Sequence, residues 1–313
     1  MTLRLVGDIG GTNARFALSE DGRAPRDEAK LPGADYPGPI EAAEAYLAGR
    51  AVEEAVLAVA TPVLGDEVAF TNSPWRFSIA DAKRRLGVER LAIINDFVAQ
   101  ASAVPHLEQG ECRVLKEGSP KPTHPAVVLG PGTGLGVAFL VDAGGTSRVL
   151  PSEGGHASFA PQDDLQEEVL RRLRVTYGGH VSLERVLSGP GLLALARIIG
   201  EVQGRPVELA GPPDVSARAA AGDCPVCSEA LRVFSGVLGA AAGNLALTLL
   251  ADRGVYVTGG LCRNLGPLLD VAALRAGFTG KGRFAGYLEK VPVIQVMRPH
   301  SGLLGAAAWR IGG

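Results

Sequence analysis

The chain has 313 residues, of which 46% are hydrophobic and 20% are charged, and its formal net charge is −2. This is the composition of an ordinary soluble globular protein with a large core in one or two domains. So small a net charge gives no electrostatic basis for binding nucleic acid or an anionic membrane surface. The first residues already follow a strand pattern and no uninterrupted apolar run reaches the ~18 residues of a membrane span. We therefore expect a cytoplasmic protein without a signal peptide.

The first motif, at residues 6–18, reads VGDIGGTNARFAL. Apolar residues alternate on both sides of the glycines, which predicts strands at 3–9 and 14–19 joined as a hairpin. A dinucleotide fingerprint or a Walker loop would instead lead into a helix. Glycines let backbone N–H groups approach an anion, and Thr12 adds a hydroxyl donor. Asp8 fits beside a phosphate only if a divalent cation lies between them. A tight hairpin with a solvated aspartate stays the alternative.

Further strands of a first α/β domain are predicted at 54–61, 66–71 and 91–95. Residues 24–39, rich in proline and glycine, are interpreted as a connection. The stretch LAIINDFVAQA (91–101) places Asn95 and Asp96 where a buried strand gives way to a helix, a position at which α/β folds bind ligands. Asp96 there suits a general base that accepts the proton of an attacking hydroxyl. The alternative, that Asn95 or Asp96 only caps the helix, stays open.

A second glycine hairpin follows residues 107–126, which are rich in proline and charge and are predicted to connect two domains. Residues 127–141 read VVLGPGTGLGVAFLV, again a strand, a loop with Thr133 and a strand. Two such hairpins indicate two related domains. A third glycine pair, Gly259 and Gly260 in GVYVTGGLCRN, follows a strand and opens a helix that could seat the outer part of a nucleotide.

Two segments in the second half of the chain carry residues that are suited to binding a polyol. In PSEGGHASFAP (151–161), Glu153 and His156 flank two glycines. An acceptor and a mixed donor and acceptor on a rigid turn match hydroxyl groups, which both donate and accept. A surface loop with an exposed histidine is the alternative. Glu184, in VSLERVLSGPG, is by itself equally well explained as a helix-surface glutamate with Ser182 as the helix cap.

The rest of the second half is predicted to be mostly helical. Predicted helices lie at 163–175, 182–187, 190–203 and 228–252, predicted strands at 254–258 and 292–297, and a final amphipathic helix at 300–311. Gly236, Gly239 and Gly243 in the long helix indicate close contacts with other helices. A membrane role for this helix is the weaker interpretation, because Asn244 and flanking charges interrupt it.

Cys224 and Cys227 form a CxxC pair, which is half of a zinc site or a redox pair. A zinc site needs two further thiolates or imidazoles at a suitable spacing, and the sequence offers none nearby. We interpret the pair as reduced structural thiols at the start of a helix, and we expect no structural zinc.

The three glycine sites, in this order, resemble the phosphate-1, phosphate-2 and adenosine motifs of the actin, hexokinase and Hsp70 superfamily. The whole chain resembles the bacterial ATP-dependent glucokinase family; the matching stretches are GDIGGTNARFAL, TNSPWRFSI, IINDFVAQA, LGPGTGLGVA, SEGGHASFAP, LERVLSGPGL and HSGLLGAAAWRI. The resemblance implies an α/β two-domain actin-like ATPase (hexokinase/ribonuclease H-like) fold with an interdomain cleft. The small domain would comprise residues 1–106 and 300–313, and the large domain residues 107–299.

The resemblance also implies a reaction, the transfer of the γ-phosphoryl group of MgATP to the 6-hydroxyl of D-glucose, with Asp96 as the catalytic base. It assigns glucose binding to Asn95, Asp96, Gly134, Glu153, His156 and Glu184. It assigns the phosphates and adenosine of ATP to Asp8, Gly10, Gly11, Thr12, Asn13, Gly132, Thr133, Gly259 and Gly260. Asp8 would act on Mg²⁺ through a water molecule. The family further suggests a homodimer.

Two features depart from the family pattern: Ser152 stands before the glutamate where a smaller residue is frequent, and GGLCRN lacks a proline, which leaves the adenine contacts undefined. The ROK kinases and repressors share DIGGT but carry a cysteine-rich zinc motif, whereas this chain has no cysteine between His156 and Cys224. The alternatives are a kinase for another hexose or phosphoryl donor and, in a different class, an actin-like or Hsp70-like ATPase switch. Such a switch would not need the residues of the sugar site.

Overall fold

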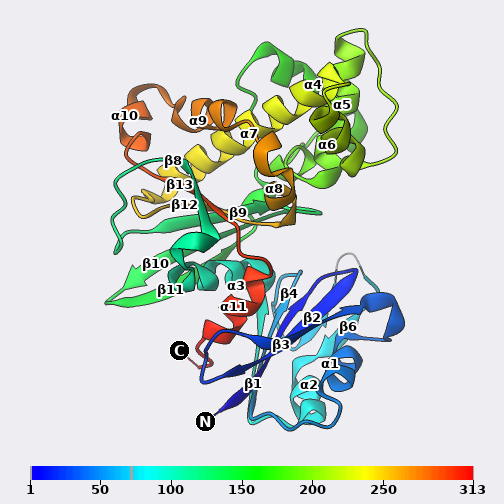
Figure 1. The fold of residues 1–313 in the computed structure, drawn as a ribbon, viewed down its shortest axis with the longest axis vertical. Coiled ribbons are helices and arrows are strands. Elements are labelled where there is room, and N and C mark those ends of the chain that lie inside the picture. Colours follow the sequence, from blue (N-terminus) through cyan, green and yellow to red (C-terminus); the bar gives the residue numbers. More distant parts are fainter. Residues whose placement is uncertain (1, 71–72, 313) are drawn as a thin grey trace. The chain divides into compact units, whose positions relative to one another are not determined.

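The computed structural model describes residues 2–70 and 73–312, and the chain divides into two compact units (Figure 1). Unit 1 comprises Met1–Gln109 and Arg298–Gly313, and unit 2 comprises Gly110–Met297. Each unit has a mixed sheet and its own hydrophobic core. The C-terminal segment therefore folds with the N-terminal part of the chain.

The sheet of unit 1 has the strand order β3-β2-β1-β4-β7. Its strands are β1 (Leu3–Ile9), β2 (Asn13–Glu20), β3 (Arg26–Pro32), β4 (Glu54–Val59) and β7 (Arg90–Asn95). The first three strands are antiparallel, and β4 and β7 run parallel to β1. The predicted hairpin of β1 and β2 is confirmed. The strand predicted at 66–71 is the short β5 (Glu67–Ala69), which pairs with β6 (Arg76–Ser78) in a separate sheet, and residue 71 lies outside the described residues.

The interpretation of residues 24–39 as a connection is wrong for Arg26–Pro32, which forms the edge strand β3. The side chains of this strand are exposed or half-buried along its whole length, so no apolar alternation marks it in the sequence. An edge strand pairs with one neighbour through its backbone, and polar side chains are usual there because they discourage further pairing. The composition of this strand therefore resembles that of a loop.

One face of this sheet packs against two helices. Its side chains, such as Leu5, Ile9 and Phe16, share one hydrophobic core with residues of α1 (Pro39–Leu47) and α2 (Ile79–Leu86). Residues two apart on a strand point to the same face, so Arg4 and Asp8 of β1 lie on the opposite face.

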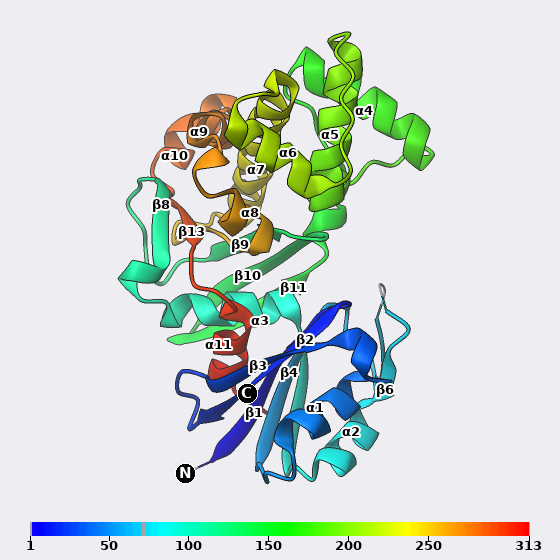
Figure 2. The same cartoon turned by 45° about the vertical axis from the view of Figure 1, so that its right-hand side comes forward.

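That opposite face is covered by α3 (Asp96–Ala103) and the C-terminal helix α11 (Ser301–Ala308), which lie against each other (Figure 2). A Cβ atom on Gly305 would be 1.7 Å from the backbone oxygen of Ala99, so only glycine permits this approach. The helix predicted at 300–311 is not amphipathic, because Ser301–Ala307 are all buried between α3 and the sheet.

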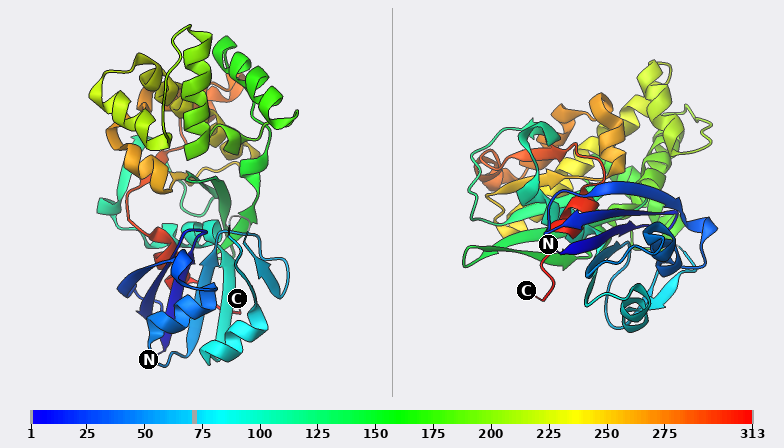
Figure 3. Two further views of the ribbon diagram at one scale, coloured as in Figure 1. Left: turned by 90° about the vertical axis from the view of Figure 1, so that its right-hand side faces the viewer. Right: turned by 60° about the horizontal axis from the view of Figure 1, so that its bottom comes forward.

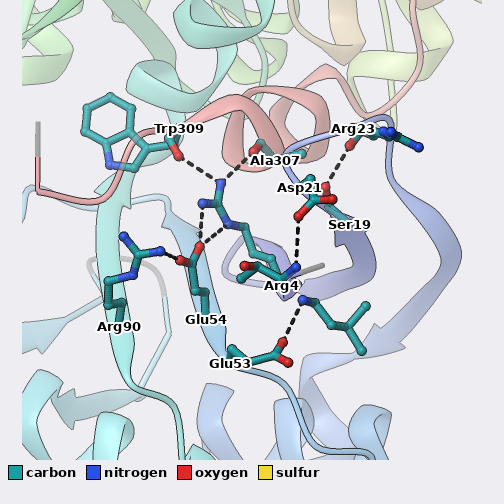
Figure 4. Close-up of polar contacts among 11 residues, drawn as sticks. Arg4, Ser19, Asp21, Arg23, Glu53, Glu54, Arg90, Ala307 and Trp309 are labelled. Atoms are coloured by element: carbon teal, nitrogen blue, oxygen red, sulfur yellow. Dashed lines mark hydrogen bonds and ion pairs between the residues drawn. The ribbon is translucent and has the colours of Figure 1, made fainter.

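The end of β1 remote from its hairpin carries an ion-pair network (Figure 4). Arg4 donates from Nε to Oε2 of Glu54 at 2.9 Å, and from Nη1 to the backbone oxygens of Ala307 (2.6 Å) and Trp309 (2.8 Å). The other oxygen of Glu54 pairs with Arg90. Arg4, Glu54 and Arg90 are cross-strand neighbours on β1, β4 and β7. Both oxygens of this buried carboxylate are thus paired, and the last turn of α11 is fixed to the first strand.

The sheet of unit 2 has the strand order β11-β10-β9-β12-β13-β8. Its strands are β8 (Cys112–Lys116), β9 (Ala126–Pro131), β10 (Leu135–Ala143), β11 (Thr146–Ser152), β12 (Gly254–Val257) and β13 (Val293–Val296). The predicted hairpin at 127–141 is confirmed as β9 and β10, and β12 and β13 run parallel to β9. The interpretation of 107–126 as a connection is wrong for β8, and β11 was not predicted. Both are edge strands.

The helices of unit 2 lie together on one side of its sheet (Figure 3). They are α4 (Asp164–Tyr177), α5 (Gly189–Val202), α6 (Pro212–Ala221), α7 (Pro225–Leu249), α8 (Gly260–Leu265), α9 (Val271–Thr279) and α10 (Ala285–Leu288). The helix predicted at 182–187 is only a 3₁₀ turn, Leu183–Arg185, because Ser188 caps the new helix α5. Helix α7 is long and apolar enough to cross a membrane, but most of its apolar stretch is buried inside unit 2, which identifies it as a core helix.

Glycines of α7 allow its close approach to α9. A Cβ atom on Gly239 would lie 1.9 Å from the backbone oxygen of Leu274, whereas one on Gly236 would lie 3.8 Å from that of Ala273. We expect Gly239→Ala to lower the free energy of unfolding by about 1–3 kcal/mol through overpacking. Gly236→Ala should raise it by roughly 0.5–1 kcal/mol, because alanine favours the helix. Urea denaturation of the two variants measures both effects, and equal effects would contradict the close approach at Gly239.

Candidate functional site

The glycine hairpin of unit 1 leaves its tip open. The backbone N–H of Gly10 donates to the oxygen of Asn13 at 3.0 Å, which closes the turn between β1 and β2. Gly11 and Thr12 at the tip are exposed, and the oxygen of Thr12 accepts from the N–H of Gly33 at 2.8 Å. The hairpin is thus held from both sides while its tip stays accessible, as a loop that binds phosphate through backbone N–H groups requires.

Asp8 lies beside this hairpin, on the face of the sheet that α11 covers. A Cβ atom on Gly302 of α11 would be 3.0 Å from Oδ2 of Asp8, so the helix backbone comes close to the carboxylate. Burial raises the pKa of Asp8, and the nearby charges of Arg15 and His300 oppose this shift. Within residues 2–70 and 73–312 there is no group of three or more His, Cys, Asp or Glu side chains that could hold a metal ion.

A single carboxylate fits a magnesium ion that keeps most of its water and is otherwise bound by nucleotide phosphates, which is how Mg²⁺ usually binds in kinases. Asp8 and the hairpin therefore fit MgATP better than a metal ion alone. The geometry agrees with the role that the sequence predicted for Asp8, and that role stays a prediction.

Asn95 and Asp96 lie where β7 gives way to α3. Asn95 Oδ1 accepts the N–H groups of Phe97 (2.9 Å) and Val98 (3.4 Å), so Asn95 does cap the helix. Its Nδ2 donates to the oxygen of Thr61 at 3.5 Å, and an amide nitrogen has a second proton to offer a ligand. Capping and ligand binding are thus compatible in this residue.

Asp96 uses one oxygen for the helix, since its Oδ1 accepts the N–H of Phe97 at 2.9 Å. Burial, and after it the charge of Asp8, raises the pKa of Asp96 to about 7. A general base works best when its pKa lies near the working pH, so this carboxylate is suited to accept a proton from a hydroxyl group.

The raised pKa makes a prediction about stability. The unfolded chain loses the Asp96 proton near pH 4 and the folded chain near pH 7, so folding stability falls as the pH rises between these values. Asp96→Asn removes this loss. We expect the free energy of unfolding of the ligand-free variant to exceed that of the wild type by roughly 1–3 kcal/mol at pH 7.5. At pH 4 the two values should be equal. Urea denaturation at the two pH values tests this, and a difference that does not depend on pH would contradict the raised pKa.

In unit 2 the glycine hairpin and Glu184 form one cluster. Oε2 of Glu184 accepts the N–H of Leu135 at 2.9 Å. A Cβ atom on Gly134 would lie 2.4 Å from the same oxygen, so Gly134 makes room for the carboxylate. Glu184 is therefore held by the hairpin and does not stand free on a helix surface.

Glu153 and His156 belong to a turn that packs on the same hairpin. A Cβ atom on Gly155 would be 1.9 Å from the backbone oxygen of Leu135, and the N–H of Leu183 donates to the oxygen of Ala157 at 2.8 Å. His156 Nε2 and Glu153 Oε2 are 3.8 Å apart, and the two side chains are 59% and 64% exposed. The structure brings these polar groups together and leaves them open to a ligand.

The third glycine site, Gly259 and Gly260, packs against the hairpin that carries Gly132 and Thr133. Gly259 has φ +94°, and a Cβ atom there would be 2.6 Å from the backbone oxygen of Pro131. Gly132 donates to the oxygen of Gly134 at 2.8 Å and accepts from the N–H of Gly189 at 2.9 Å. The predicted nucleotide residues of unit 2, Gly132, Thr133, Gly259 and Gly260, thus follow the carboxyl ends of the neighbouring parallel strands β9 and β12, where α/β sheets bind ligands.

Gly155 and Gly302 were not predicted, although each permits a close approach on which the site depends. The glycines of GGH and SGLLG were the only sequence signal. Their partners are far away along the chain, so the reason for each glycine is visible only in the fold.

The CxxC pair lies at the start of α7. Sγ of Cys224 accepts the N–H of Cys227 at 3.3 Å, so the thiol caps the helix, and both side chains are buried. Burial, with Cys224 beside it, raises the pKa of Cys227 to about 12, which leaves it as an unreactive thiol. All four cysteines are free.

We expect purified protein to contain less than stoichiometric zinc, because a buried neutral thiol is a poor ligand and the pair lacks further partners. Elemental analysis after dialysis against a chelator-treated buffer measures the metal content. One zinc ion per chain, lost in a Cys224→Ser variant, would contradict this expectation.

Comparison with known proteins gives the family. A sequence model of the glucokinase family matches residues 5–311. The glucokinase of Aromatoleum aromaticum is 43% identical over 311 residues, which cover 97% of this chain and 93% of that protein. The chain belongs to the glucokinase family. The glucokinase of Yersinia enterocolitica is also 43% identical over 308 residues, which cover 97% of this chain and 95% of the relative.

Solved structures agree with this family. The crystal structure of a glucokinase from an Antarctic psychrotroph has a TM-score of 0.88 at 37% identity, over 98% of both chains. A ROK family glucokinase from Streptomyces griseus, crystallised with glucose and AMPPNP, has a TM-score of 0.66 at 22% identity and covers 97% of this chain and 98% of its own. The second likeness shows the fold alone. The predictions of the glucokinase family, of the two-domain actin-like ATPase fold and of glucokinase activity are confirmed.

Proposed function

We propose that this chain transfers the γ-phosphoryl group of MgATP to the 6-hydroxyl of D-glucose, with Asp96 as the catalytic base, and releases glucose 6-phosphate and ADP. The observation that carries the catalytic assignment is the place of Asp96 at the carboxyl end of β7, where its Oδ1 accepts the N–H of Phe97 at the start of α3. Burial and Asp8 raise the pKa of this carboxylate to about 7. A carboxylate with this pKa accepts the hydroxyl proton as the oxygen attacks phosphorus.

The sugar is bound by Asn95 and Asp96 of unit 1 and by Glu153, His156 and Glu184 of unit 2. The carboxylates accept hydroxyl protons, and the Asn95 amide donates to a hydroxyl oxygen. Gly134 contributes by leaving the Glu184 carboxylate its place beside the hairpin. Together these side chains supply the kinds of donors and acceptors that a hexose requires.

The nucleotide is bound by the three glycine sites. The hairpin at Gly10, Gly11, Thr12 and Asn13 in unit 1 and the hairpin at Gly132 and Thr133 in unit 2 hold the phosphates. The N–H groups of Gly10 and Gly132 close the two turns, so the contacts come from the tips at Gly11, Thr12 and Thr133. Gly259 and Gly260 hold the adenosine. Mg²⁺, when bound, neutralises charge on the phosphates. Asp8 would hold the ion through a water molecule, and the N–H groups would stabilise the charge that develops during transfer.

A coupled assay with a panel of sugars and donors tests the reaction. We expect glucose with MgATP to give the highest kcat/KM, with lower values for mannose, galactose and fructose and for GTP or polyphosphate as donor. ATP hydrolysis that does not depend on a hexose would instead favour an ATPase switch. The exposed, clustered Glu153 and His156 argue for the kinase, because a switch has no use for a sugar site.

We also propose that the protein acts in the cytoplasm, as the sequence pattern predicts, and as a homodimer, as the family suggests. Size-exclusion chromatography with light scattering measures the mass, and a monomer at micromolar concentration would contradict the dimer.

A further inference from the structure

One face of the unit 1 sheet carries two rows of charged residues, one at each end. The row remote from the hairpin is Arg4, Glu54 and Arg90, in which each charge has a partner (Figure 4). The row beside the hairpin is Lys30, Arg15 and Asp8, which are cross-strand neighbours on β3, β2 and β1. Asp8 is four residues after Arg4, so both rows lie on the face that α11 covers.

In the row beside the hairpin, by contrast, a buried polar atom lacks a hydrogen-bond partner among the described residues. Nε of Arg15 is buried and has no hydrogen-bond partner among residues 2–70 and 73–312. Buried polar atoms in proteins almost always have partners, so such an atom needs an explanation. The guanidinium of Arg4, by contrast, donates to three acceptors. A purely structural role explains Arg4 and leaves Arg15 unexplained.

Asp8 is the carboxylate next to Arg15 in this row, and it is confined from two directions. Its register partner Arg15 supplies a positive charge from β2. On the side of α11, the backbone at Gly302 leaves little room, since a Cβ atom there would be 3.0 Å from Oδ2 and 3.2 Å from Cγ of Asp8. Among the described residues no hydrogen bond or ion pair joins the two side chains, so in the ligand-free protein Arg15 acts on Asp8 through its charge, while the backbone of α11 limits the carboxylate from the other side.

We propose that Arg15 is a positioning residue that holds the Asp8 carboxylate in place for the magnesium ion of the bound nucleotide. This inference rests on the proposed function, because it assigns Asp8 to that ion. Arg15 acts through Asp8 and touches neither the sugar nor the reacting atoms. Its planar guanidinium can fix a carboxylate in one plane, which a lysine ammonium cannot. Residues that orient a metal ligand typically contribute 10–100-fold to metal affinity.

Isothermal titration calorimetry separates this role from others without an activity assay. The proteins are the wild type, Arg15→Met, Arg15→Lys and Lys30→Met, and the ligands are MgADP, ADP with excess EDTA, and glucose. We expect Arg15→Met to weaken MgADP binding by about 10–100-fold and to leave metal-free ADP and glucose almost unchanged. Arg15→Lys should lose less, and Lys30→Met, which removes the exposed charge of the same row, should bind like the wild type.

Three results would overturn the proposal. Equal weakening of MgADP and metal-free ADP would place Arg15 directly on the phosphates. Unchanged MgADP binding would leave Arg15 without a role in the site. Weaker binding of all ligands together with a lower Tm would make Arg15 structural.

If Arg15→Met does not fold, Gly302→Ala disturbs the same carboxylate from the side of α11 and must give the same selective loss of MgADP binding. A wild type that does not bind MgADP at all would contradict the proposed function. A wild type that binds it, with an Arg15→Met variant that binds equally well, would contradict only the role of Arg15.

Discussion

Asparagine in place of Asp96 should lower kcat by at least ~10²–10⁴-fold, because the amide has no basic oxygen to accept the hydroxyl proton. The helix contact should survive, since an asparagine Oδ1 can accept the N–H of Phe97 as the carboxylate does. The affinity for glucose should change little. Steady-state kinetics with a coupled assay gives kcat, and calorimetry gives the affinity for the sugar.

A matched control is Asp81→Asn, which changes a carboxylate of the same unit that lies 42% exposed on α2 and pairs with Arg84. This variant should keep the kcat of the wild type. Near-normal kcat in Asp96→Asn would remove Asp96 from the role of base. Equal losses in both variants would mean that any carboxylate change disturbs the unit.

Glu184→Ala should raise KM for glucose by at least ~10²-fold and as much as ~10⁴-fold, because sugar hydroxyls then lose a hydrogen-bond partner that water does not replace. KM for ATP should stay close to that of the wild type. The N–H of Leu135 also loses its acceptor, so Glu184→Gln, which keeps an acceptor oxygen, is the milder variant. Initial rates with each substrate varied in turn measure both constants.

The neighbouring glycine provides a second route to the same effect. Gly134→Ala places a methyl group 2.4 Å from Oε2 of Glu184 and should displace the carboxylate. Because both variants act on one interaction, the double variant should be little worse than Glu184→Ala alone. Glu167→Ala on α4 is the control and should change neither constant. Equal increases of both KM values in Glu184→Ala would show that Glu184 supports the hairpin and does not bind the sugar.

The parts of the fold that could be predicted are those with a repeating apolar pattern. The hairpins of β1 with β2 and of β9 with β10 alternate around glycine turns, and α7 carries a long apolar run. The edge strands β3, β8 and β11 were not predicted from the sequence. Backbone pairing to one neighbour defines such a strand, and this pairing does not require a regular alternation of apolar and polar side chains.

Within the site, short motifs predicted which residues to consider but not how they are held. Asn95 caps α3 and still has a proton to donate, so the two interpretations weighed for it do not exclude each other. The contact of Gly134 with Glu184, and that of Gly302 with Asp8, join segments far apart in the chain. Sequence spacing carries no information on such contacts, because they depend on how helices and strands pack.

The bonds of Arg4 to the backbone of Ala307 and Trp309 have a consequence for biosynthesis. The first strand leaves the ribosome long before the last helix, and domains usually complete their folding as they emerge. Unit 2 is continuous in sequence and can finish first, whereas unit 1 must wait for α11 to cover the sheet face that bears Asp8. Until α11 has emerged from the ribosome, the part of that face that α11 covers stays exposed, so unit 1 completes its fold after unit 2 although its first strand is made before unit 2.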